Sequence, residues 1–356
     1  MPAPWRQQIS ELWQLGNKRL SELFSLDIHN NNNVLALTIS SDFIKLLKIK
    51  SLNGKYRVEN FDIVPIPPGL VLKNEIKDPM GIANMINDLY SKHPTMSKNV
   101  AICIPRSMAI VKNITVDNRL TMDEIETRVW VEANRLFPKL IDDIYLDFAV
   151  MGPSSQDTAK QDVLLVACRK EFIHPYLEVM RLSGLSAKRI DVNYFALERA
   201  LAVVAKQSPE VKTLALLNIG YTYIDLIVTH EGAATFTHEV SYDGNSLKLM
   251  GNHENSSNNT EQIELFKHSL GLQIKHAIQF FYSSRPTMRI ESIILSGDCS
   301  VAIPDLANYI QLEVNKKMIL ADPFKDMELA PTIDKEKLKH YASSFMLCCG
   351  LTLQKL

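Results

Sequence analysis

Residues 34–49 read VLALTISSDFIKLLKI, and residues 213–229 read TLALLNIGYTYIDLIVT. In both stretches an apolar run ends at a short turn and a second apolar run follows, the pattern of two antiparallel strands. A third strand is predicted after each pair, at 55–64 (KYRVENFDIV) and at 234–240 (ATFTHEV). The same opening therefore occurs twice, which predicts an internal duplication.

The remaining periodicity predicts helices and strands that complete two α/β halves with a cleft between them. Further strands are expected at 98–104, 108–116, 146–151, 162–169, 187–192 and 291–296. One helix is expected to open with the Thr121–Glu124 capping box and to close before Pro138. Other helices are expected at 78–92, 170–183, 194–205, 261–284, 304–316 (capped from the Ser300 side) and 336–352.

The composition is that of a folded globular protein of more than one domain. The chain has 356 residues, of which 46% are hydrophobic and 22% charged, and its formal net charge is -1. This balance predicts no global attraction to nucleic acid or to an anionic membrane. Five cysteines without a C-x-x-C pair fit a reducing cytoplasm, and no apolar run is long enough to span a bilayer.

Residues 1–33 are expected to form an amphipathic N-terminal segment and a linker. Trp5, Leu12 and Trp13 recur at near-helical spacing, and the run from Asn30 to Asn33 ends the pattern. Such a helix either docks on the body of the protein or meets a membrane surface or a partner. Deletion of this segment should distinguish the two alternatives.

Several common catalytic motifs are missing from the sequence. It contains no G-x-G-x-x-G, no G-x-x-x-x-G-K-[ST] and no G-x-S-x-G, which excludes Rossmann, P-loop and hydrolase-elbow sites of the usual form. His268 and His276 lack a third ligand in sequence, so no metal site is predicted. Any nucleotide site must therefore be built from backbone turns.

Three turns could hold phosphates in the predicted cleft. Ser40-Ser41 and Gly220-Tyr221-Thr222 each join the first two strands of a half, and Ser296-Gly297-Asp298 follows a buried strand. Their backbone N–H groups point outward from tight turns and can bind anions. Lys45, on the second strand, either reaches toward such a site or faces solvent.

From residue 34 to the end, the sequence resembles the PilM family, actin-like cytoplasmic proteins of type IV pilus assembly. The resemblance rests on FIKLLKI, EANRLFPKLIDDIYLDFAVMGP, IDVNYFALERAL, IILSGDCSVAIPDL, DPFKDMELAP and the closing CCGLTL. It implies an α/β actin-like ATPase fold with an FtsA-type 1C subdomain and a reduced 2B subdomain. The implied divisions are 34–104 and 171–206 (1A), 105–170 (1C) and 207–356 (2A), with a 2B remnant at 243–262.

The resemblance also implies a partner, the N-terminal cytoplasmic peptide of a PilN-type inner-membrane protein. That peptide would lie in a groove between 1A and 1C, for which the expected lining residues are Ile104, Val111, Phe148 and Arg169. The chain would then be an adaptor at the inner face of the inner membrane, associated with it through partners. Motor ATPases of pilus assembly and further copies of the chain are additional candidate partners.

Three positions depart from the nucleotide-binding pattern that the resemblance implies. Thr38 and Asn218 stand where an acidic side chain is typical, and Asn193 stands at a helix start that is often acidic. Neutral side chains hold Mg²⁺ on a nucleotide poorly and cannot orient an attacking water. ATP with Mg²⁺ is therefore expected to bind weakly or not at all, without hydrolysis; the expected contacts are Thr38, Ser40, Ser41, Lys45, Asn218, Gly220, Thr222 and Gly297.

Three classes of function remain after this reasoning. The first is a binding module, a pilus-assembly adaptor with or without nucleotide. The second is an enzyme, an actin-like ATPase in which nucleotide regulates assembly or a sugar-kinase relative using the same cleft. The third is a filament-forming cytoskeletal protein. The neutral residues Thr38, Asn218 and Asn193 favour the binding module.

Overall fold

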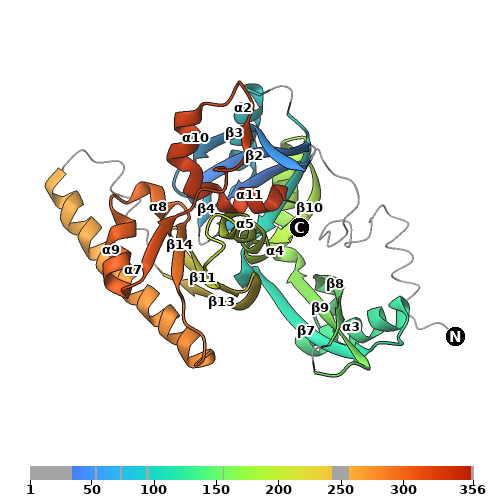
Figure 1. Cartoon of the computed structure of the whole chain (residues 1–356). Coiled ribbons are helices and arrows are strands. Elements are labelled where there is room, and N and C mark those ends of the chain that lie inside the picture. Colours follow the sequence, from blue (N-terminus) through green and yellow to red (C-terminus); the bar gives the residue numbers. More distant parts are fainter. Residues whose placement is uncertain are drawn as a thin grey trace.

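A computed structural model describes residues 34–242, apart from 53, 73, 94, 95 and 155, and residues 256–353. The predicted N-terminal segment 1–33 and most of the predicted 2B remnant, residues 243–255, lie outside the described residues. Figure 1 shows the arrangement of the helices and strands.

The first sheet has the strand order β10-β6-β1-β2-β3-β16. The three predicted strands β1, β2 and β3 form an antiparallel meander, and β6 and β10 continue beside β1 in parallel. Its strands are β1 (Leu35–Ile39), β2 (Phe43–Leu52), β3 (Lys55–Pro65), β6 (Asn99–Ile104), β10 (Ser186–Val192) and β16 (Glu328–Leu329).

The second sheet has the order β13-β12-β11-β14-β15, which repeats the first five strands of the other sheet in arrangement and direction. The duplication that the two sequence stretches predicted is confirmed. The strands are β11 (Thr213–Ile219), β12 (Tyr223–His230), β13 (Ala233–Ser241), β14 (Ser292–Ser296) and β15 (Lys317–Leu320).

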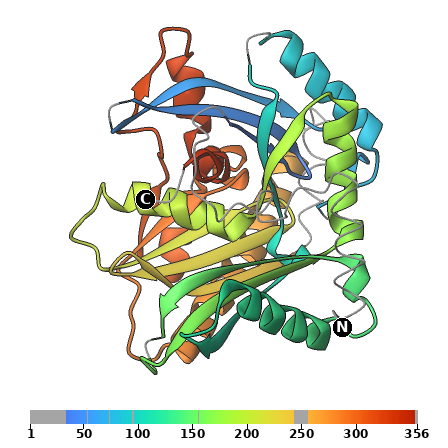
Figure 2. The same cartoon turned by 90° about the vertical axis from the view of Figure 1, so that its right-hand side faces the viewer.

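Two helices lie between the sheets and join them into one core. Helices α5 (Asn193–Ala205) and α11 (Met346–Thr352) pack against each other between the blue and the yellow strands of Figure 2. The core on the first sheet includes Leu216 and Ile227 of the second sheet. Gly350 makes this contact possible, because a Cβ there would overlap the carbonyl oxygen of Ala196.

The outer faces of the sheets carry the remaining long helices. Helices α2 (Pro79–Ser91) and α4 (Lys170–Leu182) contact each other and belong to the first core, and α7 (Ser256–Ser284) and α9 (Leu306–Val314) belong to the second. The result is an alternation of helix and sheet layers, with the ends of β1 and β11 close together where the two halves meet.

A smaller unit is inserted in the first half, between β6 and α4. Its three strands have the order β7-β9-β8, with bounds Ala109–Asp117, Lys160–Arg169 and Ile144–Pro153. One face of this sheet packs on α3 (Met122–Leu136), which begins with the predicted Thr121–Glu124 capping box. The other face turns toward the main body, since Val111, Leu164 and Val166 belong to the first core.

Two helices expected in the second half differ from the prediction. The helix expected at 304–316 is not capped from Ser300, because Ser300 lies in a separate short helix, α8 (Cys299–Ala302). Asp305, with a positive φ of 57°, separates α8 from α9. The helix expected at 336–352 is divided into α10 (Lys335–Tyr341), a 3-10 turn (Ala342–Phe345) and α11.

The sequence pattern also did not predict the short strands. Strands β4 (Val71–Leu72), β5 (Glu75–Ile76) and β16 are too brief to show a period of two, and β15 directly follows α9. The pairing of β16 with β3 brings the C-terminal region back to the first sheet.

Candidate functional site

The cleft between the two halves is narrow and lined by residues from both. A cavity of about 40 Å³ lies where the ends of β1 and β11 meet, with room for about three water molecules. Of the residues predicted to contact nucleotide, five line it: Thr38, Ser40, Lys45, Asn218 and Gly297. Ser41, Gly220 and Thr222 do not line this cavity.

Lys45 connects the first half to the second across this cleft. Its side chain is only 7% exposed, and its ammonium forms an ion pair with the equally buried carboxylate of Asp298. The same Nζ donates to the backbone oxygen of Ser344 at 2.7 Å, and the Oγ of Ser40 donates to Asp298 Oδ2 at 3.4 Å. Lys45 does not face solvent, and its charge is already neutralised within the protein.

The turn that carries Asp298 is held in place by its glycine. Gly297 has a φ of +95°, and a Cβ there would collide with the backbone of Ile219. Its N–H donates to the carbonyl oxygen of Ser343 at 3.2 Å. The turn is therefore packed between β11 and the 3-10 turn, which directs the Asp298 carboxylate toward Lys45.

Asn218 stands where the resemblance implies an acidic side chain, and a carboxylate lies beside it on the neighbouring strand. Asp225 lies directly opposite Asn218 in the β11–β12 ladder and is buried. Its Oδ2 accepts from Asn218 Nδ2 at 3.0 Å and from Asn193 Nδ2 at 3.4 Å. Burial, with the negative charge of Glu239 on β13, raises the pKa of Asp225 to about 7.

Sequence reasoning did not identify Asp225 as a site residue, and it placed Asp298 in a candidate phosphate turn without a role for its carboxylate. A signal for Asp225 was present, because residues that flank a tight turn at equal distances become cross-strand partners. No comparable signal existed for the Lys45–Asp298 pair, since its two residues are far apart in sequence and meet only in the folded protein.

The cleft as it stands does not fit a magnesium nucleotide. The hydroxyl of Thr38 lies 3.2 Å from the Sγ of Cys348, and Asn218 and Asn193 are bonded to Asp225. Mg²⁺ needs oxygen ligands free to coordinate it, and phosphates need an available cation. Within the described part of the chain, no group of three His, Cys, Asp or Glu side chains could hold a metal ion.

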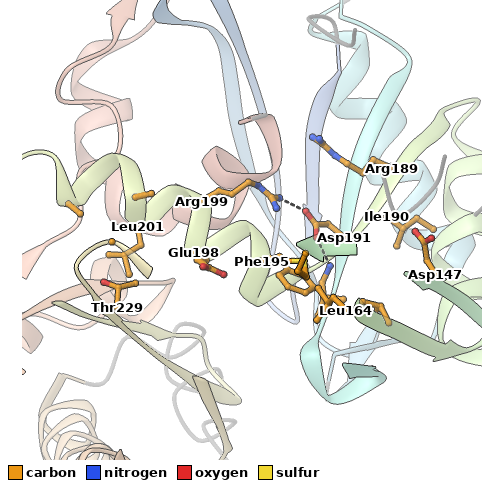
Figure 3. Close-up of a pocket in the computed structure, with 16 residues that line it drawn as sticks. Asp147, Leu164, Arg189, Ile190, Asp191, Phe195, Glu198, Arg199, Leu201 and Thr229 are labelled. Carbon is orange, nitrogen blue, oxygen red and sulfur yellow. Dashed lines mark hydrogen bonds and ion pairs between the residues drawn. The ribbon is translucent and has the colours of Figure 1, made fainter. Parts of the chain in front are cut away.

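A second cavity, of about 280 Å³, lies between the inserted unit and the main body. Figure 3 shows that its walls come from β8, β9 and β10, from α5 and from β12. Most of the lining is apolar, with Leu164, Ile190, Phe195 and Leu201 among its members. A cavity of this size and character can accept part of an extended peptide or one or two large side chains.

Charged groups on one side of this cavity are fixed by α11. Arg199 forms an ion pair with Asp191 and donates through Nε to the carbonyl oxygen of Gly350 at 2.9 Å. Arg189 donates through Nη2 to the carbonyl oxygen of Leu351. Its buried Nε–H has no hydrogen-bond partner among the described residues, and burial lowers the pKa of this guanidinium.

Residues 36–356 match the family model of the type IV pilus assembly protein PilM. The match spans most of the chain. The chain belongs to the PilM family.

Two solved structures are similar over most of the chain. One, the PilM-PilN type IV pilus biogenesis complex, has a TM-score of 0.73 at 22% identity and covers 90% of this chain and 97% of that one. The other, the ethanolamine utilization protein EutJ from Carboxydothermus hydrogenoformans, has a TM-score of 0.51 at 10% identity and covers 98% and 99%. The expected actin-like ATPase fold is confirmed, and family membership gives the chain a role in type IV pilus assembly.

None of the four residues expected to line a peptide groove in this PilM-family chain lines the 280 Å³ cavity. Val111 is on the same face of the inserted sheet as Val166, while Phe148 is on the opposite face, beneath α3. Ile104 is fully buried at the end of β6, and Arg169 forms an ion pair with Glu171 at 2.8 Å.

Among the described helices of this PilM-family chain, none is both long and apolar enough to cross a membrane.

Proposed function

We propose that this chain is an adaptor of the type IV pilus machinery that holds the N-terminal cytoplasmic peptide of a PilN-type inner-membrane protein. The observation that carries the proposal is the 280 Å³ apolar cavity between the inserted unit and α5. Membership of the PilM family and the likeness to a PilM-PilN complex support it. In this proposal the main body and inserted unit are subdomains 1A, 2A and 1C, and the groove is the boundary of 1A with 1C.

The chemistry of the cavity fits an extended peptide with an apolar side chain. Phe195 on α5 is partly exposed and Met151 on β8 is 54% exposed, so both supply apolar surface that is favourable to bury. Asp191 and Arg199 also line the cavity and supply charged groups at its edge. A bound peptide would thus meet polar groups in addition to the apolar surface.

The proposed location follows from the partner. An adaptor that holds the cytoplasmic tail of an inner-membrane protein works in the cytoplasm at the inner face of that membrane. It would link the membrane platform to cytoplasmic components, among which the motor ATPases of pilus assembly are candidates. We further propose that the cleft binds ATP weakly or not at all and does not hydrolyse it, because the Lys45 ammonium is already paired with the Asp298 carboxylate.

A cavity-filling substitution tests the proposal. A fluorescent PilN-type N-terminal peptide is titrated with the full chain and anisotropy is recorded. Ala202 lines the cavity, and Ala202→Trp should reduce the affinity at least tenfold because the added ring occupies the space. The matched control is Leu312→Trp, at an 81% exposed position on α9, which should bind like the unmodified chain. Equal binding by the Ala202→Trp protein would contradict the proposed site.

A further inference from the structure

One face of α7 is exposed although it carries large apolar side chains. Leu265 is 64% exposed, Leu272 42% and Phe280 51%. The opposite face of the same helix is buried in the core of the second half, through Phe266, Leu270, Ile274, Ala277 and Phe281. In Figure 1, α7 is the long orange helix at the outer edge of the molecule. Phe280 also packs against Phe236 and His238 of β13, and the part of its ring that stays exposed lies on the same face as Leu265 and Leu272.

The exposed residues follow one line along the helix. From Leu265 the line continues through His268, Leu272, His276 and Phe280, which are all exposed and separated by three or four residues. At 1.5 Å per residue this seam is roughly 22 Å long. We call these five residues the α7 seam. Apolar residues at such spacing are typical of a helix that packs against a second helix.

The α7 seam is nearly symmetric about Leu272. His268 and His276 lie four residues before and after it, and Leu265 and Phe280 lie seven and eight residues away. A two-fold axis through Leu272 would place that residue against its own copy, and Leu265 against Phe280 of the other molecule. Self-complementarity of this kind is what a two-fold symmetric interface requires.

The charges at the ends of α7 favour the same arrangement. Near its start Glu261 is exposed, while the charge of Glu264 is already balanced by Lys267 at 2.9 Å, and Arg285 and Arg289 are exposed just beyond its end. An antiparallel pair of helices brings the acidic start of one copy to the basic end of the other. A parallel pair would place like charges together, which is unfavourable.

We propose that the α7 seam is a docking surface for a second copy of this chain, which packs its own α7 antiparallel across a two-fold axis at Leu272. The surface lies on the second half, on the outer side of its sheet. It uses none of the residues that line the 280 Å³ cavity. The two proposed surfaces therefore do not overlap.

Cysteine cross-linking tests the proposal in the full chain. All five native cysteines are buried, so the background of oxidative cross-linking is low. Leu272→Cys should form a disulfide-linked dimer under mild oxidation, because the two Cβ atoms meet on the axis. Leu265→Cys alone should not, since its two copies would be roughly 21 Å apart along the helices, but it should cross-link when mixed with Phe280→Cys. Val131→Cys, 54% exposed on α3, controls for random collision.

A second variant separates docking from folding. Leu272→Arg should weaken the self-association measured by sedimentation velocity at least tenfold, while at concentrations low enough for both proteins to be monomeric the melting temperature should be unchanged, because the position is exposed. A chain that stays monomeric at every concentration would overturn the proposal. So would Leu272→Cys cross-linking no more than Val131→Cys, or protection of the seam by residues of the same chain in the monomer.

Discussion

The buried ammonium of Lys45 on β2 is paired with the buried carboxylate of Asp298 in the turn after β14. This ion pair joins the two halves of the duplicated fold and neutralises the lysine within the chain. The two halves of this chain are thus held together by its own side chains.

Removing one partner of the Lys45–Asp298 pair should destabilise the fold strongly. Lys45→Met leaves a buried, uncompensated carboxylate, for which the expected loss in free energy of unfolding is about 3–5 kcal/mol. The double variant Lys45→Met/Asp298→Leu should recover most of that loss. Urea unfolding of the unmodified chain, the single variant and the double variant measures both effects. Lys112→Met, which breaks an exposed ion pair with Glu132, is the control and should cost under about 1 kcal/mol.

Asp225 should make stability depend on pH. Its pKa is about 7 in the folded protein, against an ordinary 3.8, so the folded state keeps a proton that the unfolded state has lost. Stability contributed by this group therefore falls as pH rises from about 4 to about 7 and stays low above that. Asp225→Asn should become more stable than the unmodified chain across this window, by up to about 4 kcal/mol.

Urea unfolding at several pH values measures the Asp225 effect. The Asn side chain keeps an oxygen that can accept from Asn218 and Asn193, so the hydrogen bonds are preserved. A stability difference between the two proteins that is constant from pH 4 to pH 8 would show that the carboxyl is not titrating as described.

Two glycines in helices should respond oppositely to alanine. Gly350→Ala should be strongly destabilising, because its Cβ would overlap Ala196 and separate α11 from α5. Gly271→Ala on α7 meets nothing closer than 3.4 Å and should stabilise by roughly 0.5–1 kcal/mol through helix propensity. Thermal melting of both variants compares them directly. Equal effects would mean that the close approach of α11 to α5 is not maintained in solution.

ATP should have little effect on this protein. Because Lys45 is paired and the cleft cavity is only about 40 Å³, ATP with Mg²⁺ should not raise the melting temperature and no phosphate should be released. Asp298→Ala frees Lys45 and is expected to bind ATP more tightly than the unmodified chain does. Mg²⁺-dependent phosphate release by the unmodified chain that is lost in Lys45→Ala would contradict this expectation.

The duplicated fold could be predicted from sequence because its signal is local. The turns at Ser40-Ser41 and Gly220-Tyr221-Thr222 each lie between strongly apolar runs, and the hairpins form where they were expected. The residues that fill the cleft could not be found in this way. The ion pair of Lys45 with Asp298 depends on the packing of two halves, and periodicity within one strand carries no information about it.

The residues that line the cavity proposed to hold the peptide could not be found from sequence for the same reason. The resemblance implies Phe148 as a groove residue, whereas the alternation along β8 turns Phe148 toward α3 and Asp147 toward this cavity. Arg189 and Arg199 were not singled out, because their role depends on the carbonyl groups of α11, which come from the far end of the chain.

Photo-cross-linking of a PilN-type N-terminal peptide to the full chain tests the central claim most directly. A photoreactive group on the apolar side chain of the peptide, followed by mass spectrometry of the adduct, should label the cavity wall at Leu164, Phe195 or Leu201. Competition by unlabelled peptide should remove that label. Adducts confined to other surfaces, or adducts that persist under competition, would contradict the proposal that this cavity holds the peptide.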